Sequence, residues 1–268
     1  MAIYEWELLW KDAVHIWRAI YNEWAELLKN ENSEEAYQSF LSEHAGFFFC
    51  DTHSRPICIS KLKLGGDYVT DFVVPEDRWS DGWQYTLIEI ESPHTPPFTK
   101  SGHPSKRLVG ALRQIVDWKS WIASNPSIRG LLPDGRSYGA RFGLSYTIYI
   151  GTRENSAATI DHRNKWSAEH NISIRSFDAL TESFLHRSVH SFYNTSSAQL
   201  RMLGEQIRND LANPFASAYT DSDWKHIVRD PRFRQGAHMI SENVNLFLSR
   251  RTYSKRVQEF YDFLGPRV

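Results

Sequence analysis

Apolar residues recur every three or four positions near the N-terminus, which predicts a long amphipathic helix over residues 3–29. The positions that make this spacing are Leu9, Ala13, Ile16, Ile20, Trp24 and Leu27. Trp10, Trp17 and Trp24 stand seven residues apart on the same helix and form an aromatic stripe. This stripe either packs on the protein's own core or forms a subunit contact, because tryptophan is also enriched at interfaces.

A second helix is predicted directly after a capping signal. Asn32 is followed three residues later by Glu35, which is the spacing of a capping box. The helix is expected to run through EEAYQSFLSEHAGFFF, with Glu43 projecting near its far end. The apolar positions of its buried face are Tyr37, Phe40, Leu41 and Ala45.

Short apolar runs separated by turn residues then predict strands. An antiparallel meander is expected from the runs over residues 56–64, 68–74 and 85–92. A helix over 106–124 follows, and then a near-continuous apolar strand over 144–151, typical of a strand covered on both faces. The remaining elements are a helix over 158–170, a strand over 172–176 and a helix from Asp178 to His186. This order predicts an α/β fold with a central mixed sheet flanked by helices.

The pattern changes after His190, where no convincing strand is found and helical spacing dominates. Three parts are therefore expected: an N-terminal amphipathic helix over 1–30, an α/β domain over 31–190 and an α-helical C-terminal extension over 191–268. Helices are expected in the extension over 197–212, 221–228 and 239–263. Its basic cluster either contacts phosphate groups or forms a solvated face; the members are Arg250, Arg251, Lys255 and Arg256.

Composition restricts the classes of function without choosing one. The chain has 268 residues, a net charge of −1 and 41% hydrophobic residues, which is enough for a full core. A charge near zero gives no global attraction to nucleic acid but leaves room for a local basic surface. Cys50 and Cys58 show no metal-ligand spacing or disulfide framework, and no signal-peptide pattern is found, so a cytoplasmic location is expected. No apolar run reaches the roughly 18 residues of a membrane span, so no membrane partner is expected.

Acidic residues interrupt two of the predicted strands. Glu89 and Glu91 are two residues apart in LIEIE and therefore share one face of a strand, and Asp71 opens an apolar run upstream. Carboxylates are rarely buried, and neighbouring ones repel each other unless a cation lies between them. Hard divalent cations such as Mg²⁺ take oxygen ligands of this kind. The spacing suggests a metal-dependent phosphodiesterase; the alternative is an edge strand whose glutamates face water.

These elements, in this order, resemble the PD-(D/E)xK nuclease superfamily and, more narrowly, the Shedu-type (DUF4263) defence nucleases. The resemblance covers roughly residues 33–187 and is carried by SFLSEHAGFFF, GDYVTDF, LIEIESP, ALRQIVDW, IYIGTR and ISIRSFDAL. It implies a restriction-endonuclease-like core that uses Mg²⁺ (or Mn²⁺) to hydrolyse DNA in bacterial defence against phage. It also implies assembly as a homo-oligomer.

The resemblance assigns roles to individual residues. Asp71 and Glu89 are expected to hold the metal, and the backbone carbonyl of Ile90 is expected to complete its shell. Glu91 would orient or deprotonate the attacking water. Gln114, one helical turn before the aromatic residue at 118, would bind a phosphate or a catalytic water.

One residue departs from the superfamily pattern, because Glu91 stands where a lysine is usual. Lys106 is a candidate to supply that cation from the following helix. Glu43 and Asp67 are candidate additional ligands. Three functions therefore remain open: a metal-dependent DNA endonuclease or nickase, a catalytically altered DNA-binding or sensing module on the same scaffold, and a structural or oligomerisation protein built on the tryptophan-striped helix.

Overall fold

The computed structural model describes five long stretches of the chain and a few positions of its C-terminal part. The described residues are 17–49, 58–77, 83–125, 143–153, 157–188, 251–255, Ala212, Asn213, Ser222 and Arg229. The fold and the site consist of these residues.

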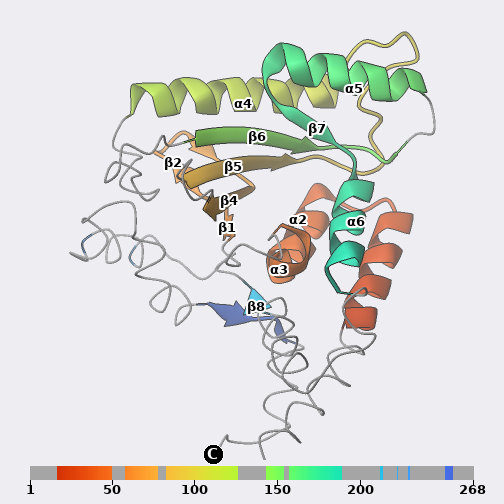
Figure 1. Cartoon of the computed structure of the whole chain (residues 1–268), viewed down its shortest axis with the longest axis vertical. Helices are drawn as coiled ribbons and strands as arrows, with labels where there is room; N and C mark the ends of the chain where they lie inside the picture. Colours follow the sequence, from red (N-terminus) through yellow and green to blue (C-terminus); the bar gives the residue numbers. More distant parts are fainter. Residues whose placement is uncertain are drawn as a thin grey trace, which may run out of the picture.

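A five-stranded mixed sheet forms the centre of the fold, in the order β1-β4-β5-β6-β7 (Figure 1). Its strands are β1 (Ile59–Ser60), β4 (Phe72–Asp77), β5 (Trp83–Ile90), β6 (Gly143–Tyr149) and β7 (Ser173–Arg175). The pairs β1–β4 and β4–β5 are antiparallel, whereas β5–β6 and β6–β7 are parallel. The prediction of an α/β fold with a mixed central sheet is confirmed.

Helices cover both faces of this sheet (Figure 1). One face carries α4 (Lys106–Ser124) and α5 (Ala157–His170). The other face carries α2 (Glu34–Glu43), α3 (Ala45–Phe48), α6 (Phe177–Ser188) and the helix over residues 17–29. The central strands are buried on both sides, which agrees with the apolar run predicted for β6.

Helix α4 has the bounds that its apolar spacing predicts. Ser105 caps it, with its hydroxyl accepting a hydrogen bond from the Leu108 backbone N–H at 3.3 Å. The buried stripe, which packs on the sheet, consists of Leu108, Ala111, Leu112, Ile115 and Trp118.

The aromatic stripe of the N-terminal helix packs inside the protein in its described part. Trp24 is fully buried, and its indole N–H donates to the Thr181 hydroxyl of α6 at 2.9 Å. Trp17 stacks on Phe184, also in α6, with 5.1 Å between ring centroids. Of the two interpretations of the stripe, the structure therefore supports core packing for these two tryptophans. Trp10 and the first part of the predicted helix lie outside the described residues.

The start and the length of the second helix differ from the prediction. Ser33, not Asn32, is the N-cap, with its hydroxyl accepting from the Ala36 N–H at 3.3 Å. The Asn32 amide instead donates to the Leu27 carbonyl at 3.0 Å and so closes the preceding helix. The predicted continuous helix breaks at His44, whose backbone is non-helical, and this separates α2 from α3. The predicted face is nevertheless buried at Tyr37, Leu41 and Ala45.

The apolar run predicted over 56–64 is divided at Lys61. This residue has a left-handed backbone (φ 54°), which ends β1 and turns the chain into β2 (Lys63–Leu64). Strand β2 pairs with β3 (Tyr68–Val69) as a separate small hairpin. The division places Lys61 beside Asp71, which precedes β4.

The C-terminal part contains a short strand pair in its described residues. Strand β8 (Ala212–Asn213) pairs antiparallel with β9 (Thr252–Tyr253). The expectation of no strand is therefore wrong at these four residues, which are too few for an alternating pattern to be recognised. Apart from Ser222, Arg229 and residues 251–255, the rest of the predicted helical extension, including Arg250 and Arg256, lies outside the described residues. No described helix is long and apolar enough to cross a membrane.

Candidate active site

The strand registers bring three residues into a row across the sheet. Lys61 and Asp71 lie one position beyond the last β1–β4 pair, and Asp71 and Glu89 lie one position beyond the last β4–β5 pair, so that the three are cross-strand neighbours. The Lys61 backbone N–H donates to the Asp71 carbonyl at 2.9 Å and continues the β1–β4 ladder. Glu91 follows two residues after Glu89, and its N–H continues the β5–β6 ladder to the Tyr149 carbonyl at 2.9 Å.

All three predicted carboxylates are buried. The exposed fractions are 6% for Asp71, 5% for Glu89 and 6% for Glu91. Strand β5 has neighbours on both sides, so the alternative of an edge strand with water-facing glutamates is wrong. Burial of several acids in one place is costly and is common at functional sites.

The electrostatics of the site show that these acids repel each other. Burial, followed by the charges of Asp71 and Glu91, raises the pKa of Glu89 to about 9. Burial, followed by the charge of Glu34, raises the pKa of Glu91 to about 7, and Arg107 opposes this rise. The site therefore retains protons at neutral pH, and a cation among the carboxyl groups would relieve the repulsion.

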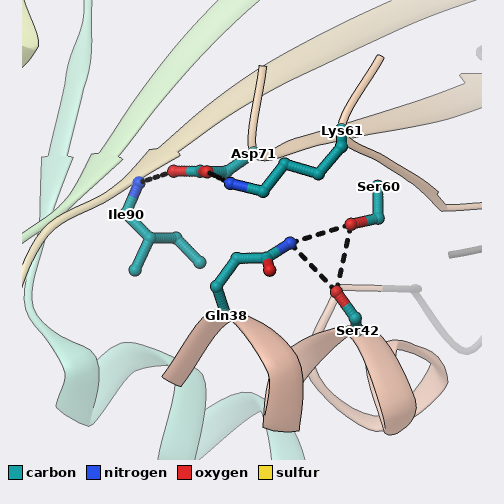
Figure 2. Close-up of polar contacts among 6 residues, drawn as sticks. All are labelled: Gln38, Ser42, Ser60, Lys61, Asp71 and Ile90. Carbon is teal, nitrogen blue, oxygen red and sulfur yellow. Dashed lines mark hydrogen bonds and ion pairs between the residues drawn. The ribbon is translucent and has the colours of Figure 1, made fainter. Parts of the chain in front are cut away.

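The carboxylate of Asp71 has a partner on each oxygen (Figure 2). Its Oδ2 accepts a hydrogen bond from the Ile90 backbone N–H at 2.7 Å, which connects the start of β4 to the end of β5. Its Oδ1 forms an ion pair with the Lys61 ammonium at 2.5 Å. Asp71 is thus held in one orientation by two neighbouring strands.

Two charged residues that the sequence pattern did not point to complete the cluster. Glu34 lies in the first turn of α2; burial and the charge of Asp71 raise its pKa. Arg107 of α4 lies between two acids, with its Nη1 at 3.9 Å from Glu34 Oε2 and 3.8 Å from Glu91 Oε2. An acid in the first turn of a helix usually complements the helix dipole. The position of Glu34 in the sequence therefore gave no reason to place it beside the other carboxylates.

One carboxylate oxygen of the site has no donor. Glu91 Oε2 is buried without a hydrogen bond, because Arg107 is beyond hydrogen-bond distance. A buried oxygen of this kind fits a cation ligand in its chemistry, as do the other carboxylates. In the described part of the chain, however, no three His, Cys, Asp or Glu side chains are grouped so that they could hold a metal ion. The donor types fit Mg²⁺, and the carboxyl groups would have to approach one another to share it.

Gln114 lies on the exposed side of α4. The buried stripe of α4 runs through Ala111, Ile115 and Trp118, and Gln114 falls outside it with an exposed side chain. Gln114 and Trp118 therefore do not share one face toward the site. Trp118 is a core residue.

The other candidates occupy exposed positions. Lys106 is exposed at the start of α4, and the ion pairs to the site come from Lys61 and Arg107 instead. Glu43 is exposed at the last position of α2, at the opposite end from Glu34. Asp67 is exposed in the turn between β2 and β3.

A polar cluster beside the site joins α2 to β1 (Figure 2). The Gln38 amide donates to the Ser60 hydroxyl at 2.8 Å and to the Ser42 hydroxyl at 3.1 Å. The two hydroxyls are themselves 3.0 Å apart. This cluster fixes the residue that precedes Lys61.

Comparison with known families gives one match. Residues 31–181 match the family model described as Shedu protein SduA, C-terminal. The matched range contains the whole carboxylate cluster, including Glu34 and Arg107. No curated protein and no solved structure matches the chain. Because the match covers more than half of the sequence, the chain belongs to the family of the Shedu SduA C-terminal region, and this membership suggests a role in anti-phage defence.

Proposed function

We propose that this protein is a Mg²⁺- or Mn²⁺-dependent DNA endonuclease or nickase of the PD-(D/E)xK superfamily, with a restriction-endonuclease-like core. The observation that carries the proposal is the buried group of Asp71, Glu89 and Glu91, in which burial, followed by neighbouring negative charges, raises the pKa of both glutamates. Such an arrangement destabilises the fold unless a cation compensates it. Membership of the Shedu family supports a defence role against phage.

In this proposal Asp71 and Glu89, with the carbonyl of Ile90, hold the metal. When bound, the ion supplies a Lewis acid for the phosphodiester and lowers the pKa of a coordinated water. Asp71 is oriented for this role by the Ile90 N–H. Glu91 has a pKa of about 7, which suits a group that accepts a proton near neutral pH.

Although position 91 is a glutamate and not the usual lysine, two other residues bring positive charge to the site. Lys61 pairs with Asp71, and Arg107 lies within 4 Å of both Glu34 and Glu91. In our proposal Arg107, whose side chain is 67% exposed, contacts a DNA phosphate at the edge of the site.

Homo-oligomeric assembly and a cytoplasmic location are also part of the proposal. Val109 and Val116, which are 51% and 53% exposed on α4, offer apolar surface for such an assembly. Sedimentation of the parent and of a Val116→Lys variant tests this element separately from the chemistry.

A second candidate is a DNA-binding or sensing module that does not cleave. It is favoured by the engagement of both Asp71 oxygens and by the absence, among the described side chains, of a group ready to hold a metal. This candidate predicts DNA binding without cleavage under any divalent metal.

The deciding experiment is a cleavage assay on linear, supercoiled and single-stranded DNA with Mg²⁺ or Mn²⁺. We expect metal-dependent cleavage that falls at least about 100-fold in Asp71→Asn and Glu89→Gln. Glu43→Gln, at the exposed end of α2, is the matched control and should cleave as the parent does. Cleavage that persists in both site variants, or in the presence of a chelator, would contradict the proposal. DNA binding without cleavage would favour the second candidate.

A further inference from the structure

We propose that Lys61 is an internal counter-ion that takes the place of a divalent cation on Asp71, and that it competes with the metal for this carboxylate. The inference rests on the proposed function, because the competing ion is the metal of that site. It concerns a residue that directly follows β1 and lies outside the acidic motif.

The ion pair occupies the one oxygen of Asp71 that is open to a cation. Oδ2 is taken by the Ile90 N–H, so Oδ1 is the remaining ligand position, and the Lys61 ammonium lies 2.5 Å from it. The Asp71 side chain is only 9% exposed, whereas that of Lys61 is 52% exposed. The acid is therefore fixed in the protein, and the ammonium reaches it from the solvent side.

The backbone at Lys61 is held in an uncommon conformation. Its φ of 54° is in the left-handed region, which is strained for a residue that carries a side chain. Two features hold it there: the hydrogen bond from its N–H to the Asp71 carbonyl, and the polar cluster that fixes Ser60 to Gln38 and Ser42 (Figure 2). A lysine maintained in such a position by its surroundings indicates a specific role for its side chain.

The charge of Lys61 acts on more than one carboxyl group. It pairs directly with Asp71, and it is the last of the charges that act on Glu34 and Glu89. A single positive charge does not balance three buried carboxyl groups, those of Asp71, Glu89 and Glu91. A divalent ion compensates them better, which favours the exchange.

The inference predicts a gain in metal affinity when the charge of Lys61 is removed. Calorimetric titration of the full chain with Mn²⁺ should show about threefold to tenfold tighter binding for Lys61→Met than for the parent. Lys63→Met removes an exposed charge two residues further on and should bind as the parent does. Lys61→Arg keeps the charge and should not gain affinity. Circular dichroism verifies folding, and Lys61→Gln carries the same expectation should the methionine variant not fold.

Each outcome of this titration decides between the two claims. Unchanged or weaker binding in Lys61→Met, with a parent that binds Mn²⁺, overturns the role of Lys61 and leaves the proposed function intact. Binding in Lys61→Met but not in the parent supports the counter-ion and contradicts a metal-dependent activity of the parent. Absence of binding in both proteins overturns both claims.

Discussion

Arg107 faces Glu91 with 3.8 Å between its Nη1 and the glutamate Oε2, a distance that forms an ion pair but no hydrogen bond. The same nitrogen is 3.9 Å from Glu34 Oε2. One guanidinium from the start of α4 thus lies between an acid of α2 and the acid that directly follows β5. Because neither acid engages it closely, its remaining donors are available to an anion that approaches the edge of the site.

We expect removal of this guanidinium to weaken DNA binding. Arg107→Gln should lower affinity about threefold to tenfold and reduce the salt dependence of binding by about one ion, because one phosphate contact is lost. Fluorescence anisotropy at several salt concentrations measures both quantities. Arg113→Gln, an exposed arginine on the same helix, is the control; an equal loss there would show a general charge effect instead.

The free energy of unfolding should decrease as pH rises from 5 to 9 in the absence of metal. A glutamate in the unfolded chain has an ordinary pKa of 4.5, whereas the pKa of Glu89 in the folded protein is about 9, so between these values the folded state binds the extra proton. Ionisation then favours the unfolded chain by about 1.4 kcal/mol per pH unit for one such group. Glu91, with a folded pKa of about 7, acts in the same direction over a narrower range.

Urea denaturation at pH 5, 7 and 8.5 measures this dependence. Glu89→Gln removes the titrating group and should flatten the profile, whereas Glu43→Gln, on the exposed end of α2, should keep the slope of the parent. Stability that increases steadily over this range would show that the carboxyl is not held protonated.

Divalent metal should stabilise the protein most at alkaline pH, where the carboxyl groups are ionised. At about 100 times its dissociation constant, Mn²⁺ should add about 2.7 kcal/mol to the free energy of unfolding. Thermal unfolding at pH 8.5 should therefore show a rise in melting temperature for the parent and little or none for Asp71→Asn. An equal rise in both proteins would locate the metal elsewhere.

DNA cleavage by a Glu91→Lys variant distinguishes a nuclease that uses Glu91 from a catalytically altered module that lacks the usual lysine. With Arg107 at 3.8 Å from the Glu91 carboxylate, a lysine would bring two positive charges together, so we expect Glu91→Lys to lose cleavage. Glu91→Gln keeps the shape of the side chain and controls for packing. A gain of cleavage in Glu91→Lys would instead support the catalytically altered module.

In the β2–β3 turn, replacement of Gly65 by alanine should destabilise the protein, whereas the same replacement at Gly66 should not. Gly65 has φ +67°, and a Cβ there would lie 2.8 Å from the Trp121 ring of α4. Gly65→Ala should therefore destabilise the protein by about 1–3 kcal/mol in thermal or urea denaturation. At Gly66 a Cβ meets no atom within 4 Å, so Gly66→Ala is the matched control.

The sequence by itself determined the elements whose signal is periodic. Apolar positions at helical spacing predicted α4 with its observed bounds, because the buried stripe of a helix repeats over many residues. The alternation of β5 put Glu89 and Glu91 on one face, whereas the register with β4 placed Asp71 beside them. The exact start of α2 was not determined by the sequence, because Asn32 and Ser33 are adjacent and both are residue types that cap helices.

Only the tertiary structure decided which charges surround these acids. Glu34, Lys61 and Arg107 come from three elements far apart in the chain, and no spacing connects them to the acidic strand. The direction of Gln114 was also undecided, because a helical side chain faces a site only when the packing of its helix turns it there. Sequence periodicity shows which side of a single helix or strand is buried. Which side chains of different elements come together depends on how the sheet and its helices pack.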